Sequence, residues 1–322
     1  MVSGKAAEAG EEVGGAPVWV LADPRPGTAN QALGIADRLG VAYRVVPLVW
    51  GPLVRLPWPW PTLLGLDAAS RARLQPPWPR LVVSAGRRSA PVALWLGRRG
   101  VRTVHAMRPG FGSAAFDLLV LGRHDRPRQE PNVFPILGAC HRLSAAVLAG
   151  AREAWPEHSA LPSPRVAVLI GGPVRGEGMD PDQARRLVGN LRDRFVKSSF
   201  LVSTSRRTGE AATAAIAEAL TGAPHRLFRW GEAGPNPYAG FLAWADAVVV
   251  TADSVSMLAE ACATTAPVFV AGEARGRHAR LVASLIASGR VAPLAAPSPL
   301  SAVPLDEAAR VAAEIRARGW LA

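Results

Sequence analysis

The stretch NPYAGFLAWADAVVVTADSVSMLAE, residues 236–260, decides the fold class. Val248, Val249 and Val250 form a continuous β-branched run, which is typical of a strand buried on both faces of a parallel sheet. A short helix over residues 238–245 precedes this strand, and a second helix starts near Ser254. Free N–H groups at the start of a helix attract anions, so the polar turn between strand and helix is expected to bind a phosphate or a sugar.

Several side chains of this turn have distinct expected roles. Asp253 or Ser254 is expected to cap the helix. Ser256 and Glu260 lie one helical turn apart, so they project from the same face of the helix. From this stretch alone, an ordinary capped helix with a glutamate of no special role remains an equal alternative.

The composition is that of a globular α/β protein. The chain has 322 residues, enough for two domains, with 49% hydrophobic and 19% charged residues. No apolar run is long enough for a transmembrane helix, and residues 1–16 read as a disordered leader without the features of a signal peptide. Cys140 and Cys262 have no metal-site spacing and suit a reducing cytoplasm. We therefore expect a cytoplasmic protein.

The net charge of +12 comes almost entirely from arginine, since Lys5 and Lys197 are the only lysines. Arginine suits bidentate recognition of phosphate, so nucleic acid, an anionic membrane surface and a phosphorylated small molecule are the partners to weigh. The chain has no basic tail, no zinc-finger spacing and no aromatic RNA-binding signature. Binding to nucleic acid is therefore not expected.

Polar groups follow two strands of the N-terminal half, over residues 18–22 and 81–83. Ligands in open α/β sheets bind at such carboxyl ends of strands. The candidates for contact with a bound group are Arg25, Gly27, Asn30 and Gln31 after the first strand, and Gly86, Arg87 and Arg88 after the other.

Three residues of this half are candidates for acid–base chemistry. Asp23 follows the first strand directly, and its carboxylate is one of them. His124 and Asp125 follow the strand predicted over residues 116–121. A histidine–aspartate pair on a loop is also commonly structural, and both interpretations of this pair stay open.

Residues 50–78 combine four tryptophans with many prolines, as in the run LPWPWP. Proline excludes a long regular element here. Tryptophan favours places that are apolar at one end and wet at the other, including bilayer interfaces. This stretch is either a long loop folded onto its own domain or a flap that touches a membrane or a lipid-linked acceptor.

The alternation of strands and helices begins again after a proline-rich linker over residues 155–164. The strand over residues 165–170 ends in Gly171 and Gly172, which allow a close approach of backbone or ligand. The strand over residues 200–204 ends in a Ser-Arg-Arg-Thr turn. We divide the chain into an N-terminal domain (17–154), a C-terminal domain (165–300) and a final helix (301–322). The pattern predicts two Rossmann-like domains facing across a cleft.

The motifs of both halves together resemble one family. They are GTANQALG from Gly27, AGRRSAP from Ala85, the Ser205-Arg-Arg-Thr turn, Asn236-Pro-Tyr, and VTADSVSMLAEA from Val250. The sequence is similar, over about residues 17–290, to the mitochondrial fission family named for the elongated-mitochondria mutants of plants. Many bacterial members are described as glycosyltransferases. Many members also carry a histidine where this chain has Thr28, so no histidine base is expected in that turn.

The resemblance implies a GT-B-like fold, with the sugar nucleotide in the C-terminal domain, the acceptor in the N-terminal domain, and a terminal helix that crosses back. It implies a glycosyltransferase acting on an envelope glycan or a lipid-linked acceptor, without metal or cofactor, in loose contact with the inner face of the plasma membrane. The implied base is Asp23, with His124 or Asp125 second. The donor-site candidates are Gly171, Gly172, Ser205, Arg206, Arg207, Thr208, Asn236, Pro237, Tyr238, Thr251, Asp253, Ser254, Ser256, Met257 and Glu260.

Two other functions stay open. The plant relative acts in organelle fission, so a non-catalytic adaptor or membrane-recruitment protein on a degenerate GT-B fold is the main alternative. A nucleotide-sugar epimerase would ordinarily need a dinucleotide fingerprint and a Tyr-x-x-x-Lys pair. Neither Tyr43 nor Tyr238 is followed by lysine four residues on, which argues against that class.

Overall fold

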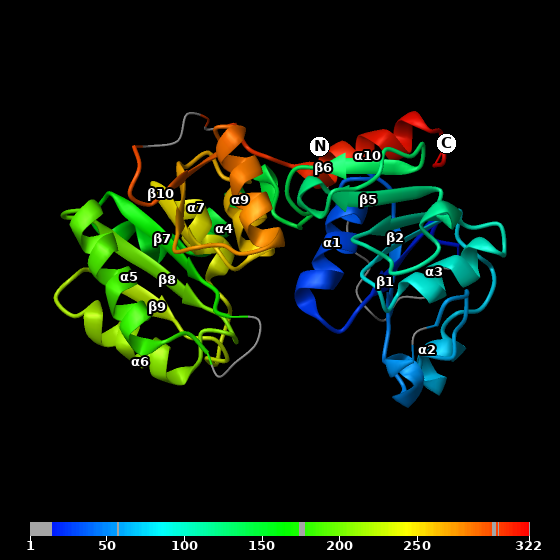
Figure 1. The fold of residues 1–322 in the computed structure, drawn as a ribbon, viewed down its shortest axis with the longest axis horizontal. Helices are drawn as coiled ribbons and strands as arrows, with labels where there is room; N and C mark the ends of the chain where they lie inside the picture. The colour runs from blue at the N-terminus through cyan, green and yellow to red at the C-terminus, as the bar shows by residue number, and fades with distance from the viewer. Residues whose placement is uncertain (1–14, 57, 174–177, 298–300, 302, 322) are drawn as a thin grey trace. The chain divides into compact units, whose positions relative to one another are not determined.

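The computed structural model describes residues 15–56, 58–173, 178–297, 301 and 303–321 (Figure 1). Most of the expected leader therefore lies outside the described residues. The chain forms two compact units. The first contains the described residues up to Arg142 and from Asp306 onward, and the second is Leu143–Leu305.

Every strand pair in the sheet of the first unit is parallel, so its strands are joined by crossover connections. Its strand order is β2 (Tyr43–Pro47), β1 (Val18–Ala22), β3 (Leu81–Ala85), β4 (Arg102–Ala106), β5 (Leu118–Gly122) and β6 (Val133–Ile136). Its helices are α1 (Pro26–Asp37), α2 (Ala68–Ala72), α3 (Ala90–Gly97) and α10 (Glu307–Ala317). The order changes direction between β1 and β3, and such switch points are the usual ligand sites of open sheets.

The C-terminal helix α10 belongs to the first unit, as expected. Val311 and Ile315 pack with Ile35 of α1 in the core on one face of the sheet (Figure 1). Asp306 caps α10 and also pairs with Arg38, with 3.1 Å between Arg38 Nη2 and Asp306 Oδ2. The last helix thus completes a core formed by the opposite end of the chain.

The second unit is a parallel six-stranded sheet with a different order. The order is β12 (Val291–Pro293), β11 (Val268–Ala271), β10 (Ala247–Thr251), β7 (Arg165–Ile170), β8 (Ser199–Thr204) and β9 (His225–Phe228). Its helices are α4 (Ala145–Ala154), α5 (Pro181–Arg194), α6 (Glu210–Ala219), α7 (Tyr238–Trp244), α8 (Val255–Ala261) and α9 (Arg277–Ala287). The switch point lies between β7 and β10. Two Rossmann-like α/β units are therefore confirmed.

The structure differs from the sequence prediction at two places. Helix α4 begins at Ala145, after the Ser144 side chain caps it, and it groups with the second unit although it lies within residues 17–154. It packs there on α7, where Arg152 donates a 2.8 Å hydrogen bond to the carbonyl of Ala243. The three-residue strand β12 was not predicted, because so short a segment carries no readable pattern.

Candidate functional site

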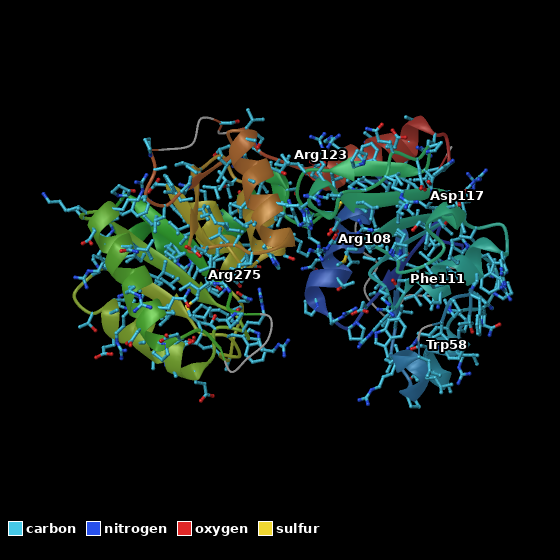
Figure 2. The ribbon with its side chains drawn as sticks, viewed as in Figure 1. Trp58, Arg108, Phe111, Asp117, Arg123 and Arg275 are labelled. Atoms are coloured by element: carbon cyan, nitrogen blue, oxygen red, sulfur yellow. The ribbon has the colours of Figure 1, made fainter. Side chains whose placement is uncertain are left out.

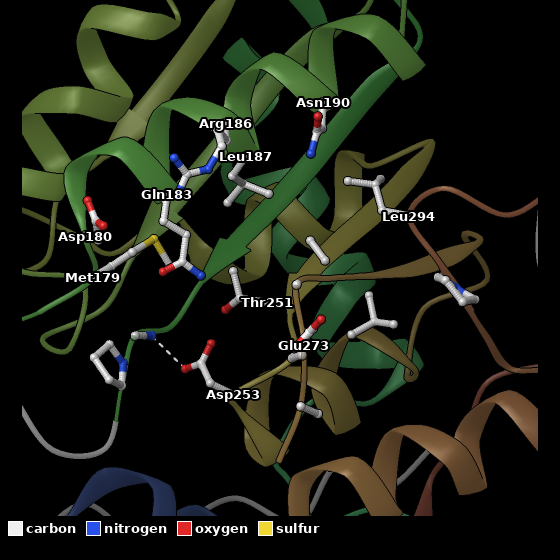
Figure 3. A pocket seen from close by; sticks show the side chains of 18 of the residues that line it. Met179, Asp180, Gln183, Arg186, Leu187, Asn190, Thr251, Asp253, Glu273 and Leu294 are labelled. Atoms are coloured by element: carbon white, nitrogen blue, oxygen red, sulfur yellow. Dashed lines mark hydrogen bonds between the residues drawn. The ribbon is translucent and has the colours of Figure 1, made fainter.

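The switch point of the second unit is built on two adjacent glycines after β7. The Gly171 N–H donates to Thr251 Oγ1 (2.8 Å), and the Gly172 N–H donates to Asp253 Oδ2 (2.6 Å; dashed in Figure 3). A Cβ atom on Gly171 would lie 2.1 Å from Asp253, and one on Gly172 would lie 2.0 Å from the carbonyl oxygen of Arg207. Gly172 also has φ +151°, so glycine is required at both positions. The turns after β7 and β10 are thus in direct contact.

The Ser-Arg-Arg-Thr turn after β8 joins the same cluster. The hydroxyls of Ser205 and Thr208 donate to the Gly171 carbonyl at 3.0 and 2.7 Å. Arg207 Nη1 donates to the Gly172 carbonyl (2.7 Å) and lies 3.2 Å from Asp253 Oδ2. The Arg206 side chain is exposed. A backbone amide and a guanidinium therefore converge on one carboxylate, and Arg207 rather than Arg206 faces the switch point.

Helix α8 starts beside this cluster and presents Glu260 at its other end. Ser254 caps the helix by accepting a hydrogen bond from Met257 N, at 3.4 Å. The Glu260 carboxyl is half-buried and accepts a 2.6 Å hydrogen bond from the hydroxyl of Tyr238. Burial raises the pKa of Glu260 to about 7, although the Tyr238 hydrogen bond acts in the opposite direction. Glu260 is therefore balanced between its neutral and charged forms near neutral pH.

The other predicted residues of this region support α7 and α8. Asn236 Oδ1 accepts a 3.0 Å hydrogen bond from Tyr238 N, and the buried Pro237 precedes the first turn of α7. Ser256 and Met257 lie half-buried in the first turn of α8. Tyr238, the first residue of α7, reaches Glu260 with its hydroxyl.

A cavity of about 1470 Å³ opens at the carboxyl ends of the strands in this unit (Figure 3). Of the predicted donor residues, Gly172, Thr251 and Asp253 line it, whereas Ser254, Glu260 and the Ser205–Thr208 turn do not. The other polar residues along its wall include Gln183, Arg186 and Asn190 of α5, and Glu273, Arg275 and His278 after β11. The structure therefore connects the switch point to a larger cavity whose α5 wall was not predicted.

The α5 wall carried a signal that the sequence alone did not interpret. Gln183, Arg186 and Asn190 are three, four and seven residues apart, so they share one helix face, which Figure 3 shows along the cavity. A polar helical stripe is usually a solvated surface, and only the structure shows that this one borders a cavity.

His278 lies on another part of the cavity wall. Burial lowers the pKa of His278, the positive charges of Arg277 and Arg207 lower it further, and Asp253 raises it.

The switch point of the first unit holds Asp23 and Arg25. The buried Asp23 carboxylate accepts hydrogen bonds from Arg25 N (2.9 Å), Nε (2.8 Å) and Nη2 (3.0 Å). Burial raises the pKa of Asp23, but the hydrogen bonds and charge of Arg25 lower it more, and the net pKa lies below its ordinary value. Such a carboxylate is a weak base whose acceptor sites are largely occupied. It anchors Arg25, and its role as the general base stays a prediction.

The turn after β3 meets the turn after β1. Gly86 has φ +81°, and a Cβ atom there would lie 2.8 Å from the γ-methyl of Thr28. Gln31 is buried and Asn30 half-buried in α1, whereas Gly27, Arg87 and Arg88 are exposed. The acceptor-side candidates of these two turns are therefore gathered at one sheet edge.

His124 and Asp125 lie after β5 and apart from that edge. Two strands separate β5 from β1, a distance of roughly 14 Å at the usual strand spacing. His124 is buried, and its Nε2 lies 3.8 Å from Asp125 Oδ2. A Cβ atom on Gly122 would lie 2.2 Å from the imidazole, so glycine is required before the pair. The two base candidates are therefore alternatives and not members of one cluster.

The described residues contain neither a metal-binding cluster nor a helix that could span a membrane. Within that part of the chain, no three or more histidine, cysteine, aspartate or glutamate side chains gather in a way that would hold a metal ion. None of the helices that the structure describes has both the length and the apolar character needed to span a bilayer.

Comparison with known proteins identifies the family. The family model described as mitochondrial fission ELM1 matches residues 26–319. The chain belongs to the mitochondrial fission ELM1 family. Mitochondrial fission protein ELM1 of Arabidopsis thaliana is 31% identical over 293 residues, covering 80% of this chain and 68% of the plant protein. Protein RP120 of Rickettsia prowazekii is 26% identical over 298 residues, covering 79% of this chain and 82% of its own length. The family resemblance is thus confirmed.

Solved structures place this ELM1-family member in the GT-B fold class. A UDP-GlcNAc 2-epimerase from Methanocaldococcus jannaschii aligns with a TM-score of 0.53 at 14% identity, covering 92% of each chain. An epimerase from Neisseria meningitidis aligns with a TM-score of 0.51 at 10% identity, covering 94% of this chain and 92% of that one. MnaA of S. aureus also aligns with a TM-score of 0.51 at 11% identity, covering 95% of this chain and 89% of that one. At such identities the likeness concerns the fold alone.

Proposed function

We propose that this ELM1-family member is a metal-independent glycosyltransferase whose nucleotide-sugar donor binds at the second-unit switch point. The observation that carries the proposal is the convergence of Gly172 N–H and Arg207 on a single carboxylate beside the cavity. Hydrogen-bond donors and a cation directed at one anionic group are what a diphosphate requires. Fixed donors of this kind stabilise the negative charge that develops on a leaving diphosphate.

The Asp253 carboxylate defines how a diphosphate would meet this site. It balances the charge of Arg207, so a diphosphate shares these donors with it or displaces it. Arg275 and His278 on the cavity wall add positive charge or hydrogen bonds for the phosphates. Glu260 is placed in the proposal as the acceptor of ribose hydroxyl hydrogen bonds, and Ser254 and Ser256 as further phosphate ligands.

The solved structures of this fold supply the first nucleotide to test. One of them is titled as a complex with UDP and another as a complex with UDP-GlcNAc. We therefore take uridine diphosphate as the probe. The acceptor that we propose is a glycan or a lipid-linked molecule bound at the first-unit switch point, with Asp23 as the base. The proposed location is the cytoplasm, in peripheral contact with the plasma membrane.

Thermal unfolding with and without UDP tests the donor site. At a concentration about 100 times the dissociation constant, UDP should stabilise the protein by roughly 2.7 kcal/mol. Arg207→Met should weaken UDP binding, because it removes the cation beside Asp253, whereas Arg226→Met on the exposed edge of β9 should not. If neither UDP nor any other nucleoside diphosphate raises the melting temperature, the donor site is refuted.

Epimerisation is a second candidate, favoured by the titles of the aligned structures. The missing dinucleotide fingerprint does not decide the matter, because an architecture of this type accommodates proteins titled as 2-epimerases. Incubation with UDP-GlcNAc and no acceptor separates the two reactions. An epimerase converts the sugar nucleotide, whereas a transferase leaves it intact until an acceptor is added.

The adaptor role is favoured by the family description, which names mitochondrial fission. An adaptor on a degenerate fold has no requirement for a nucleotide. Stabilisation by UDP that Arg207→Met abolishes would therefore argue against a purely structural protein.

A further inference from the structure

The loop between Trp50 and Leu66 exposes an unusual number of large apolar side chains. Leu53, Leu56, Trp60 and Leu64 are 42%, 51%, 51% and 45% exposed. With the neighbouring Val49, they are five of the ten exposed large hydrophobic residues in the part of the chain that the structure describes. Scattered exposed apolar residues are normal, but such a concentration marks an interaction surface. We call these four residues the apolar tip.

The apolar tip stands on a closed and well-anchored base. Trp50 and Leu66 form an antiparallel bridge, and Gly51 N donates to the Gly65 carbonyl at 3.0 Å. Leu66 is buried in the core, and Trp50 and Leu63 pack against it. The base therefore belongs to the first unit, as one of the two sequence interpretations expects, while the tip remains outside that core.

Internal contacts keep the tip in shape. The Trp58 indole N–H donates to the Leu53 carbonyl at 2.9 Å, and its ring meets that of Trp60 edge-on, with 5.7 Å between centroids. Trp58, labelled in Figure 2, thus supports the exposed Leu53 and Trp60 from within the loop. Because these contacts already order the loop, little conformational entropy is lost when its apolar side chains bind a partner.

The sequence around the apolar tip carries almost only positive charge. Residues 38–116 contain twelve arginines, no lysine and a single acidic residue, Asp67, for a net charge of +11 out of +12 in the whole chain. Asp67 is engaged in capping α2, where it accepts a 2.7 Å hydrogen bond from Ser70 N. Arg55 is exposed within the loop, and Arg71 and Arg73 are exposed in α2 and directly after it, where the chain leaves the loop. This charge complements an anionic surface.

We propose that the apolar tip inserts into the outer layer of an anionic bilayer while Arg55, Arg71 and Arg73 contact the lipid phosphates. Apolar insertion combined with basic attraction is how proteins bind a membrane surface without spanning it. Tryptophan suits the headgroup level, because its ring is apolar and its N–H is polar. Membrane contact would bring the proposed glycosyltransferase to its acceptor. Only this biological purpose rests on the proposed function.

The position of the tip relates it to the first-unit switch point. The loop leaves the end of β2 where Leu48 N donates to the Ala22 carbonyl, at 2.9 Å. Ala22 directly precedes Asp23. The loop that carries the tip therefore starts at the sheet edge where the acceptor is expected.

Vesicle co-sedimentation of the full chain tests the proposal. At low salt the protein should pellet with phosphatidylcholine vesicles that contain phosphatidylglycerol, and binding should weaken with added salt, because charge attraction is screened. Replacing Leu53, Leu56 or Trp60 by serine should reduce partitioning by roughly tenfold each, the value of one buried apolar side chain. Trp230→Ser, at an exposed tryptophan of the second unit, is the matched control and should bind like the wild type.

Each outcome bears on the proposal. Equal recovery in the supernatant with and without anionic vesicles overturns it, and so does wild-type binding by the three serine variants, because adsorption would then be purely electrostatic. A protein partner captured at the tip by a chain that ignores vesicles would also refute the lipid assignment. The melting temperature of each tip variant without nucleotide shows that it is folded, so this test does not depend on the donor site.

Discussion

Glu260→Gln isolates an ionisable group that we assign to the proposed donor site. Glutamine has nearly the same shape and can still accept the 2.6 Å hydrogen bond from the Tyr238 hydroxyl. It cannot ionise, so the substitution removes only the charge. The comparison therefore measures what a buried carboxylate costs the fold and what it contributes to nucleotide binding.

The sign and size of the stability effect follow from the pKa of Glu260. Burial raises this pKa from 4.5 to about 7, so the folded protein binds the proton more tightly than the unfolded chain. The resulting stability is fully present below the unfolded pKa and is lost as the pH rises through the folded pKa. At about 1.36 kcal/mol per pH unit, the full effect is roughly 3 kcal/mol, most of it between pH 5 and pH 8.

Melting temperatures at pH 5 and pH 8 provide the measurement. At pH 5 the wild type and Glu260→Gln should be similar, because the carboxyl is largely protonated. At pH 8 the variant should be more stable by roughly 2.5 kcal/mol, which corresponds to about 5–10 °C for a domain of this size. Glu218→Gln, at an exposed glutamate of α6, is the control and should show no such pH-dependent gain.

Nucleotide affinity supplies the second half of the test. If the ionised carboxylate accepts hydrogen bonds from ribose, the wild type should bind UDP more tightly at pH 8 than at pH 6, by about tenfold, because charge-assisted hydrogen bonds are stronger than neutral ones. Glu260→Gln should bind weakly at both. A stability difference that does not change with pH would refute the raised pKa. Unchanged UDP affinity in the variant would remove Glu260 from the site.

Two further substitutions test the first-unit base and the core of the second unit. Asp23→Asn should fold and bind UDP normally but lose turnover by about 10²–10⁴-fold in a transferase assay, while unchanged turnover would move the assignment to His124 and Asp125. Arg290→Met should lower the stability by roughly 3 kcal/mol or more in thermal unfolding, because the buried guanidinium donates to several carbonyls, including that of Thr264. A melting temperature within a degree of the wild type would show that these carbonyls find other partners.

The strands and switch-point turns were predictable because their signals are local. The run of Val248, Val249 and Val250 is fully buried, as a β-branched run between polar turns indicates. Parallel strands bring their carboxyl ends to one edge, so the contact between Gly172 and Asp253 follows from topology once the strand order is known. The two Rossmann-like units therefore followed from the pattern of apolar runs and turns, whereas the GT-B-like assignment came from the family resemblance.

The details of the site depended on distances that a pattern does not contain. Arg206 and Arg207 are equivalent in the sequence, and only the path of the turn decides that Arg207 meets Asp253. The hydrogen bonds from Arg25 that occupy Asp23 depend on a tight turn of three residues. The polar stripe of α5 acquires meaning only from the cavity beside it. Side-chain orientation is thus the limit of sequence reasoning here.

The stability cost of the Glu260 carboxyl helps to distinguish an enzyme from a scaffold. A half-buried carboxyl with a pKa near 7 lowers stability at neutral pH, and a neutral or apolar residue at Glu260 would remove that cost. Proteins tolerate such costs mainly where a ligand or a reaction depends on them, since stabilising substitutions are otherwise easy to find. A scaffold with no ligand gains nothing from a carboxyl group that lowers its stability, so the raised pKa of Glu260 supports the proposed donor site.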